Sequence, residues 1–216
     1  MKAIYLFLLG EFELLPLIIG LVRYRRLGKT YRPFLLMLAL AVLNQLVSYI
    51  FLKTMHLNSV PNNIYGLLEW ILIAWQFHVW GLLRQRKLLF YLLVVLVSLI
   101  WVVEDIVLGG ITDYPPYFQV FDAFVIVLMS VRKINFMITH DDRNLSGNPV
   151  FLICIGFIIL FIYEIVLEWA YQMSLQGATE TTNRIIIGFS YVDVLVNIIF
   201  AVALWKIPRP QKFTLK

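Results

Sequence analysis

Long runs of apolar residues fill most of this chain, and each run ends at charged residues, proline or asparagine. A helix needs about 20 predominantly apolar residues to cross a bilayer, so runs of this length predict membrane-spanning helices. Pro33, Pro61 and Pro149 support the boundaries, because the first turn of a helix tolerates a missing backbone N–H. The runs predict seven spans, near residues 3–22, 31–52, 62–83, 88–108, 115–131, 149–171 and 185–205.

We therefore expect an all-α fold, a polytopic membrane protein in which residues 1–216 form a single seven-helix transmembrane domain. Pro16 lies inside the first predicted span and is expected to kink it. The composition agrees, because 61% of the 216 residues are hydrophobic and only 14% are charged, too few to cover the surface of a soluble domain. The single cysteine, Cys154, excludes an intramolecular disulfide and a thiolate metal cluster.

The eighteen lysine and arginine residues predict the orientation, because basic residues gather in cytoplasmic connections. Most of them fall on one side of the predicted membrane, within 23–32, 84–87, 132–143 and 206–216. The other side holds only Lys2, Lys53 and Arg184. This asymmetry predicts an N-terminus outside the cell and a C-terminus in the cytoplasm. Anionic lipid headgroups account for the net charge of +5, so no nucleic-acid partner is needed.

Several acidic residues fall within the predicted spans, where an ionisable side chain costs about 2.5 to 3.5 kcal/mol and usually faces a bundle interior or a wet cavity. The deepest lie in the outer half: Glu69, Asp122, Glu164 and Asp193. Helical spacing places polar neighbours on the same faces, since Ser190, Asp193 and Asn197 follow one another at i, i+3 and i+7. Glu11 and Glu13 point about 200° apart on the first helix, so only one of them can reach a shared cavity.

These stripes predict an outward-opening acidic polar cavity among the third, fifth, sixth and seventh spans, with a contribution from the second. The alternative is that the polar side chains only join helices through hydrogen bonds, worth about 0.6 kcal/mol each. The candidate ligand-binding residues are Glu69, Asp122, Glu164, Asp193, Asn44, Ser48, Asn62, Tyr65, Trp70, Gln119, Arg184 and Asn197.

The sequence gives no catalytic motif. No HExxH, GxSxG, P-loop or paired-cysteine pattern occurs. A retinal pigment is excluded, because the last span has no lysine before Lys206 to form a Schiff base. The three histidines do not form a zinc site, since His56 and His140 are expected on opposite faces of the membrane. A hard divalent cation held by Glu69 and its acidic neighbours is the one metal that the residue types allow. We expect no other cofactor.

These features favour a non-enzymatic, receptor-like component that binds a small ligand or a lipid headgroup in the outer cavity. With such short connections it would act through a membrane or cytoplasmic partner, or as a homo-oligomer within the lipid bilayer. The alternatives are a small secondary transporter that uses the intramembrane carboxyl groups for coupling, and a lipid-modifying enzyme with a carboxylate-held metal. Compact connections indicate a bacterial inner membrane as the location.

Overall fold

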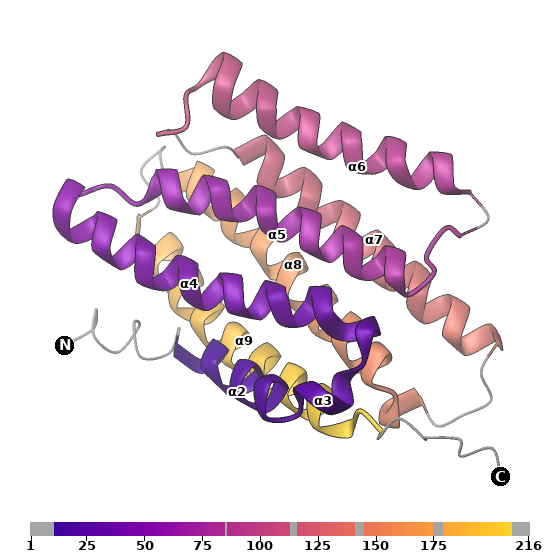
Figure 1. The fold of residues 1–216 in the computed structure, drawn as a ribbon. Helices are drawn as coiled ribbons and strands as arrows, with labels where there is room; N and C mark the ends of the chain where they lie inside the picture. Colours follow the sequence, from indigo (N-terminus) through magenta and orange to yellow (C-terminus); the bar gives the residue numbers. More distant parts are fainter. Residues whose placement is uncertain (1–10, 85, 113–115, 141–144, 175–178, 209–216) are drawn as a thin grey trace, which may run out of the picture.

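The computed structural model describes residues 11–84, 86–112, 116–140, 145–174 and 179–208 (Figure 1). Helices make up most of this part of the chain, which confirms the all-α prediction. Its α-helices are α2 (Leu14–Val22), α3 (Tyr24–Leu27), α4 (Arg32–Met55), α5 (Ser59–Val79), α6 (Lys87–Val102), α7 (Pro116–His140), α8 (Pro149–Ser174) and α9 (Thr179–Lys206). Short 3₁₀ turns cover Glu11–Glu13, Lys29–Tyr31 and Leu145–Gly147, and a π-helical turn at Val103–Leu108 continues α6.

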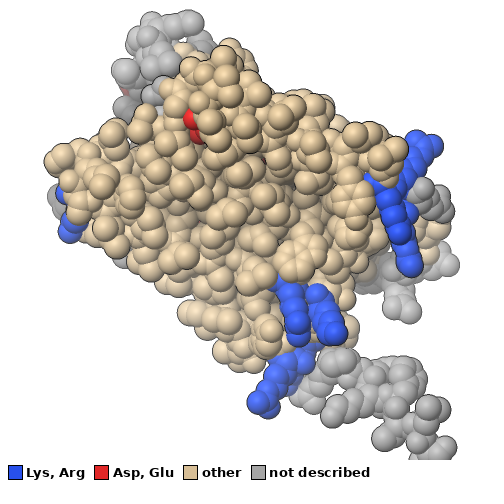
Figure 2. Space-filling view, turned by 45° about the horizontal axis from the view of Figure 1, so that its top comes forward, with Lys and Arg blue, Asp and Glu red and all other residues tan. Residues whose placement is uncertain are grey.

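Four helical stretches are long and apolar enough to cross a membrane, which indicates an integral membrane protein. They are Lys29–Met55, Lys87–Leu108, Pro149–Gln172 and Arg184–Lys206. Large apolar side chains remain exposed along these stretches, including Leu43, Val95 and Ile162. Figure 2 shows a broad, mostly uncharged surface, with a small acidic patch near its top and lysine and arginine at its edges. Such a surface suits contact with lipid rather than with water.

The helix bounds differ from the predicted ranges where charge interrupts an apolar run. The run that predicts 115–131 stops before Arg132 and Lys133, yet α7 continues to His140. Charged residues end the apolar stretch but form helix readily, so hydropathy alone places this end too early. Pro16 lies in the first turn of α2, which follows a 3₁₀ turn. The change of helical geometry thus precedes the proline, whose ring would clash with the carbonyl four residues earlier in an α-helix.

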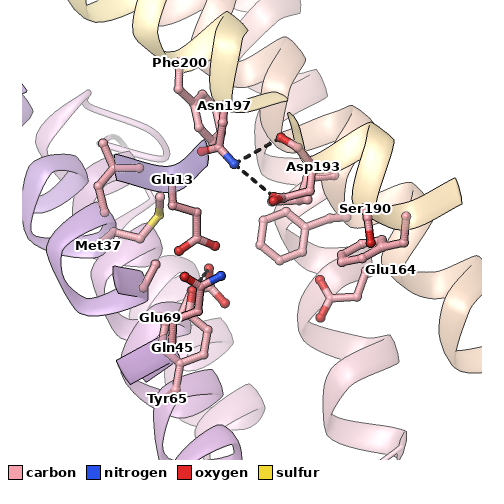
Figure 3. Close-up of a pocket in the computed structure, with 15 residues that line it drawn as sticks. Glu13, Met37, Gln45, Tyr65, Glu69, Glu164, Ser190, Asp193, Asn197 and Phe200 are labelled. Carbon is pink, nitrogen blue, oxygen red and sulfur yellow. Dashed lines mark hydrogen bonds between the residues drawn. The ribbon is translucent and has the colours of Figure 1, made fainter. Parts of the chain in front are cut away.

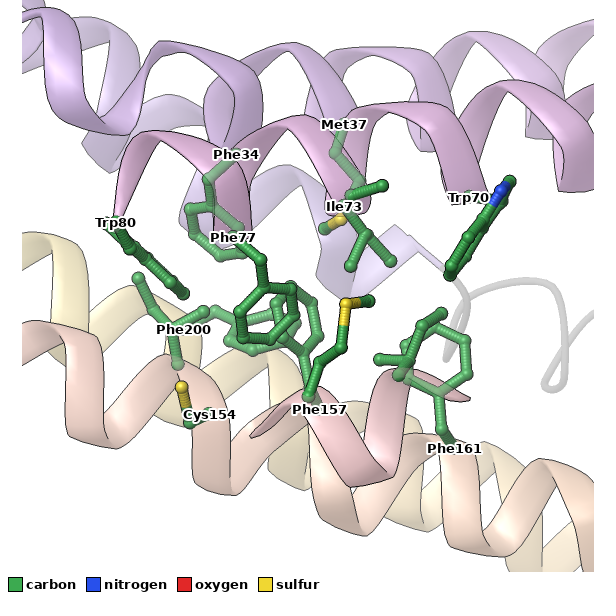
Figure 4. Close-up of a cluster of buried hydrophobic side chains, with 14 of the residues drawn as sticks. Phe34, Met37, Trp70, Ile73, Phe77, Trp80, Cys154, Phe157, Phe161 and Phe200 are labelled. Carbon is green, nitrogen blue, oxygen red and sulfur yellow. The ribbon is translucent and has the colours of Figure 1, made fainter. Parts of the chain in front are cut away.

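The helices pack side by side as a bundle, with α6 at one edge and α2 beside α9 at the other (Figure 1). The closest neighbours are α8 with α9, α7 with α8, and α4 with α5. Aromatic rings from α4, α5, α8 and α9 fill the centre (Figure 4). Phe34 and Phe200 meet edge to face with ring centres 5.1 Å apart, and Phe157 lies 5.5 Å from Phe200. Such pairs contribute beyond their apolar area, so this aromatic cluster fixes how the four helices meet.

Four hydrogen-bonded contacts gather the basic connections at one end of the bundle, which we call the basic end. The Arg23 guanidinium donates to the carbonyls of Trp205 and Ile207. The Lys133 Nζ donates to the Trp80 carbonyl over 2.7 Å, and the Lys206 Nζ donates to the Ser146 carbonyl over 3.1 Å. The basic end therefore comprises residues 23–32, 80–84, 86–87, 132–140, 145–148 and 205–208. These connections lie on one side of the bundle, and the distribution of lysine and arginine along the sequence predicts the same grouping.

The fourth contact is made by Gln76, which is fully buried. Its Oε1 accepts the Phe34 N–H over 2.8 Å, and its Nε2 donates to the Thr30 carbonyl over 2.7 Å. Amide groups in the first turn of a helix lack partners within that helix, so the α5 side chain caps α4. Both the oxygen and the nitrogen of the Gln76 side-chain amide are hydrogen-bonded, so Gln76 has a structural role.

Replacing Gln76 by leucine keeps the volume but leaves the Phe34 N–H without its acceptor in a buried position. We expect Gln76→Leu to lower the free energy of unfolding by about 1–3 kcal/mol. Thermal unfolding in detergent, followed by tryptophan fluorescence, measures the loss. The matched control is Gln119→Leu, because Gln119 is half-buried on α7 and makes no such cap. Equal midpoints for the two variants would contradict the capping role.

The contact between α8 and α9 depends on a glycine. A Cβ at Gly156 would overlap the ring of Phe200, which is 2% exposed and held by other aromatic rings. Small residues let membrane helices approach closely, so Gly156→Ala should push the two helices apart and cost about 1–3 kcal/mol. The thermal midpoint of the purified protein measures this. Gly147→Ala is the control, because nothing lies within 4 Å of a Cβ there, and an unchanged Gly156→Ala midpoint would refute the close-packing argument.

Candidate functional site

A cavity of about 300 Å³ lies among α4, α5, α8 and α9, next to the 3₁₀ turn that precedes α2. Polar side chains face it from several directions (Figure 3). Glu13, Gln45 and Glu69 lie on one side, and Glu164, Ser190 and Asp193 on the other. The full lining is Glu13, Met37, Leu38, Ala41, Gln45, Tyr65, Glu69, Leu160, Phe161, Glu164, Phe189, Ser190, Asp193, Asn197 and Phe200.

The charge of this acidic cavity is one-sided. Four carboxyl groups line it, from Glu13, Glu69, Glu164 and Asp193, and each comes from a different helical segment. Among the described residues, no lysine, arginine or histidine belongs to the lining. Charges interact more strongly away from bulk water, so the cavity favours a positively charged occupant.

Hydrogen bonds orient two of these carboxyl groups. The Tyr65 hydroxyl donates to the Glu69 Oε1 over 2.7 Å, one turn away on α5. The Asn197 Nδ2 donates to the Asp193 Oδ1 over 3.1 Å and to the Asp193 carbonyl over 3.0 Å, again one turn away on α9 (Figure 3). In both pairs the residues are four apart in the sequence, which brings their side chains together on one face of the helix. The site thus presents fixed acceptors rather than freely rotating acids.

The structure brings five of the predicted site residues to the cavity: Tyr65, Glu69, Glu164, Asp193 and Asn197. Asp122 is buried on α7 just outside the lining, where an oxygen of its carboxyl group accepts the Ala123 N–H over 2.6 Å. It lies near Glu69 and Glu164, but its side chain is not part of the cavity lining.

Three other predicted residues form a separate hydrogen-bond network between α4 and α5. The Asn62 Oδ1 accepts from the Asn44 Nδ2 over 3.0 Å and from the Ser48 hydroxyl over 2.8 Å. None of the three lines the acidic cavity. In the described part of the chain, these three side chains form hydrogen bonds with one another. They therefore join α4 to α5, which is the alternative role considered for polar side chains within the spans.

The remaining candidates also lie outside the lining. Trp70 is fully buried in the aromatic cluster (Figure 4), and Gln119 is half-buried on α7. Arg184 is exposed and pairs with Glu180 over 2.8 Å one turn away on α9. Such exposed pairs contribute little, so Arg184 does not neutralise the cavity.

Three polar residues of the lining are not among the predicted ligand-binding residues: Glu13, Gln45 and Ser190. Only one of Glu11 and Glu13 was expected to reach the cavity, and the structure places Glu13 there, whereas the Glu11 side chain is outside the described residues. Helical spacing placed Ser190 on the face of Asp193 and Asn197, although it was not predicted to bind the ligand. Helical spacing does not identify Gln45 as a lining residue. Its neighbour Asn44 contacts Asn62 outside the cavity.

The carboxyl groups do not gather as metal ligands. In the described ranges, no group of three or more His, Cys, Asp or Glu side chains is placed to hold a metal ion. The acidic groups instead line the walls of a cavity larger than an ion and share it with the aromatic faces of Phe161, Phe189 and Phe200. An organic cation matches this combination of separated carboxyl groups and aromatic rings.

The acidity of the cavity can be measured by thiol modification, since Cys154 is fully buried and gives a low background. A cysteine in place of Ser190 should react at least tenfold faster with a cationic methanethiosulfonate than with an anionic one of similar size, because the carboxyl groups attract the cation. Thr112→Cys, at an exposed position before α7, is the control and should show no such preference. Equal rates for the two reagents at position 190 would show that the cavity is not acidic in solution.

Comparison with known proteins supplies no relative for this chain. No protein-family model, curated protein or solved structure matches it.

Proposed function

We propose that this protein is a non-enzymatic membrane protein that binds a small organic cation in the acidic cavity. The observation that carries the proposal is the lining itself: carboxyl groups from Glu13, Glu69, Glu164 and Asp193, with no basic side chain among the described lining residues. Withdrawing several like charges from water is costly unless a positive charge joins them. A cationic ligand meets that need, and aromatic faces beside the carboxyl groups favour an ammonium group further.

We further propose that the chain crosses the membrane seven times, with the basic end in the cytoplasm and the acidic cavity toward the outside. The basic connections support this orientation, because such residues are retained on the cytoplasmic side. Glu13 precedes Arg23 by ten helical residues, and Asp193 precedes Trp205 by twelve, so the acids lie roughly 15 Å or more from the basic end. Compact connections remain our reason for placing the chain in a bacterial inner membrane.

The aromatic cluster supports a receptor-like role over transport. Phe34, Phe77 and Phe157 pack between the acidic cavity and the basic end and are all at most 1% exposed. The ligand thus has no polar path onward in this conformation, and its binding would reach a partner protein through helix movement. A proton-coupled transporter is the second candidate, favoured by carboxyl groups that lie within helices apolar enough to span the membrane.

Cation binding is tested on the purified protein in nanodiscs of zwitterionic lipid, by calorimetry with primary, secondary and quaternary amines. Choline and its uncharged isostere 3,3-dimethylbutanol form the most direct pair. We expect at least one amine to bind at least tenfold more tightly than its neutral analogue. Glu69→Gln and Asp193→Asn should each weaken this binding at least tenfold, a loss of about 1.4 kcal/mol or more.

Glu180→Gln is the matched control, because it also removes one carboxyl group but from an exposed position on α9. Its affinity should equal that of the unmodified protein. The proposal fails if no amine in the panel binds, or if the amines bind no better than their neutral analogues. Uptake of the bound amine into proteoliposomes, lost in Glu69→Gln, would favour the transporter instead.

A further inference from the structure

A second cavity, of about 550 Å³, lies at the basic end, between the α5–α6 connection and the last turns of α7. It is separate from the acidic cavity and shares no lining residue with it. We call it the basic cavity. Its lining is Trp80, Gly81, Leu82, Leu83, Arg84, Arg86, Arg132, Lys133, Phe136 and His140.

The basic cavity has the opposite charge pattern to the acidic one. Arg84, Arg86, Arg132 and Lys133 line it, and no aspartate or glutamate does so among the described residues. Lys133 is occupied by its hydrogen bond to the Trp80 carbonyl, which ties α7 to the end of α5. Within the described ranges, no hydrogen bond or ion pair joins the three arginines to another side chain. Three guanidinium groups therefore remain available to an anion.

The backbone holds these arginines in place. Gly81 has a φ of +77° and Leu83 a φ of +56°, a conformation that side chains other than glycine rarely adopt. Leu82 is buried and its N–H donates to the Phe77 carbonyl over 3.0 Å, which anchors the turn to the core. The Arg86 N–H donates to the Leu83 carbonyl over 2.7 Å, which holds Arg86 close to Leu83. A strained, anchored turn between basic residues is typical of a preformed binding loop.

We propose that the basic cavity binds the phosphate of an anionic phospholipid headgroup. Guanidinium groups present paired donors that match phosphate oxygens, and arginine is the preferred side chain for such contacts. The cavity is much larger than inorganic phosphate and leaves room for the glycerol part of a headgroup. Phe136 belongs to the lining and is 54% exposed, so it offers an apolar surface that suits an acyl chain. This site does not depend on the function proposed for the acidic cavity.

The test is native mass spectrometry of the detergent-purified protein titrated with phosphatidylglycerol or with phosphatidylcholine of the same acyl chains. We expect the protein to bind phosphatidylglycerol at least tenfold more tightly. The double variant Arg84→Gln with Arg132→Gln should bind the two lipids equally. Arg84→Lys with Arg132→Lys keeps the charge but loses the paired donors, so its preference should fall between these values.

The control removes two positive charges elsewhere, by Lys53→Gln with Arg184→Gln, both outside the basic cavity, and it should keep the full preference. An unchanged preference in the Arg84→Gln and Arg132→Gln variant, with its helicity and thermal midpoint retained, overturns the proposal. Displacement of phosphatidylglycerol by millimolar inorganic phosphate would assign the cavity to free phosphate and overturn the lipid assignment.

Discussion

Several polar groups inside this apolar bundle find their partners on a neighbouring helix, and these contacts fix how the helices meet. Gln76 satisfies the start of α4 from α5, and Asn62 accepts hydrogen bonds from two α4 side chains. Glu104 accepts the N–H groups of Tyr117 and Phe118 over 3.0 and 2.6 Å and so caps the start of α7. Each contact joins two helical segments, because an unsatisfied buried polar group costs more than the hydrogen bond itself contributes. The carboxyl groups of the acidic cavity depart from this pattern, since their number exceeds the positive charge within reach.

The sequence predicts the positions of the helices well, but it does not predict which polar side chains contact one another. Apolar runs about 20 residues long place the helices, because a bilayer requires such runs whatever the packing. They misplace the end of α7, where charged residues continue the helix beyond Val131. Helical periodicity correctly places Ser190, Asp193 and Asn197 on one face that reaches the cavity. It cannot show that Asn44 and Ser48 meet Asn62, because a polar stripe that faces a cavity and one that faces another helix have the same spacing.

The two cavities divide the molecule by charge. Acids at one level come from four helical segments and surround the acidic cavity, and arginines from two segments line the basic cavity. Between them lies the aromatic cluster, in which Phe77 meets Trp80 with ring centres 5.5 Å apart. The two cavities share no lining residue, and the buried rings of this cluster lie between their oppositely charged side chains.

Hydrogen bonds join neighbouring helices at both ends of the bundle. Arg23 ties α2 to α9, Gln76 ties α5 to α4, and Lys133 ties α7 to α5. At the level of the acidic cavity, the Glu69 and Asp193 carboxyl groups accept hydrogen bonds from their own helices. At the opposite end of the bundle, Asn62 joins α5 to α4, and the Thr182 hydroxyl donates to the Ala170 carbonyl over 3.0 Å and so joins α9 to α8. The acidic cavity therefore lies between two levels at which hydrogen bonds join neighbouring helices.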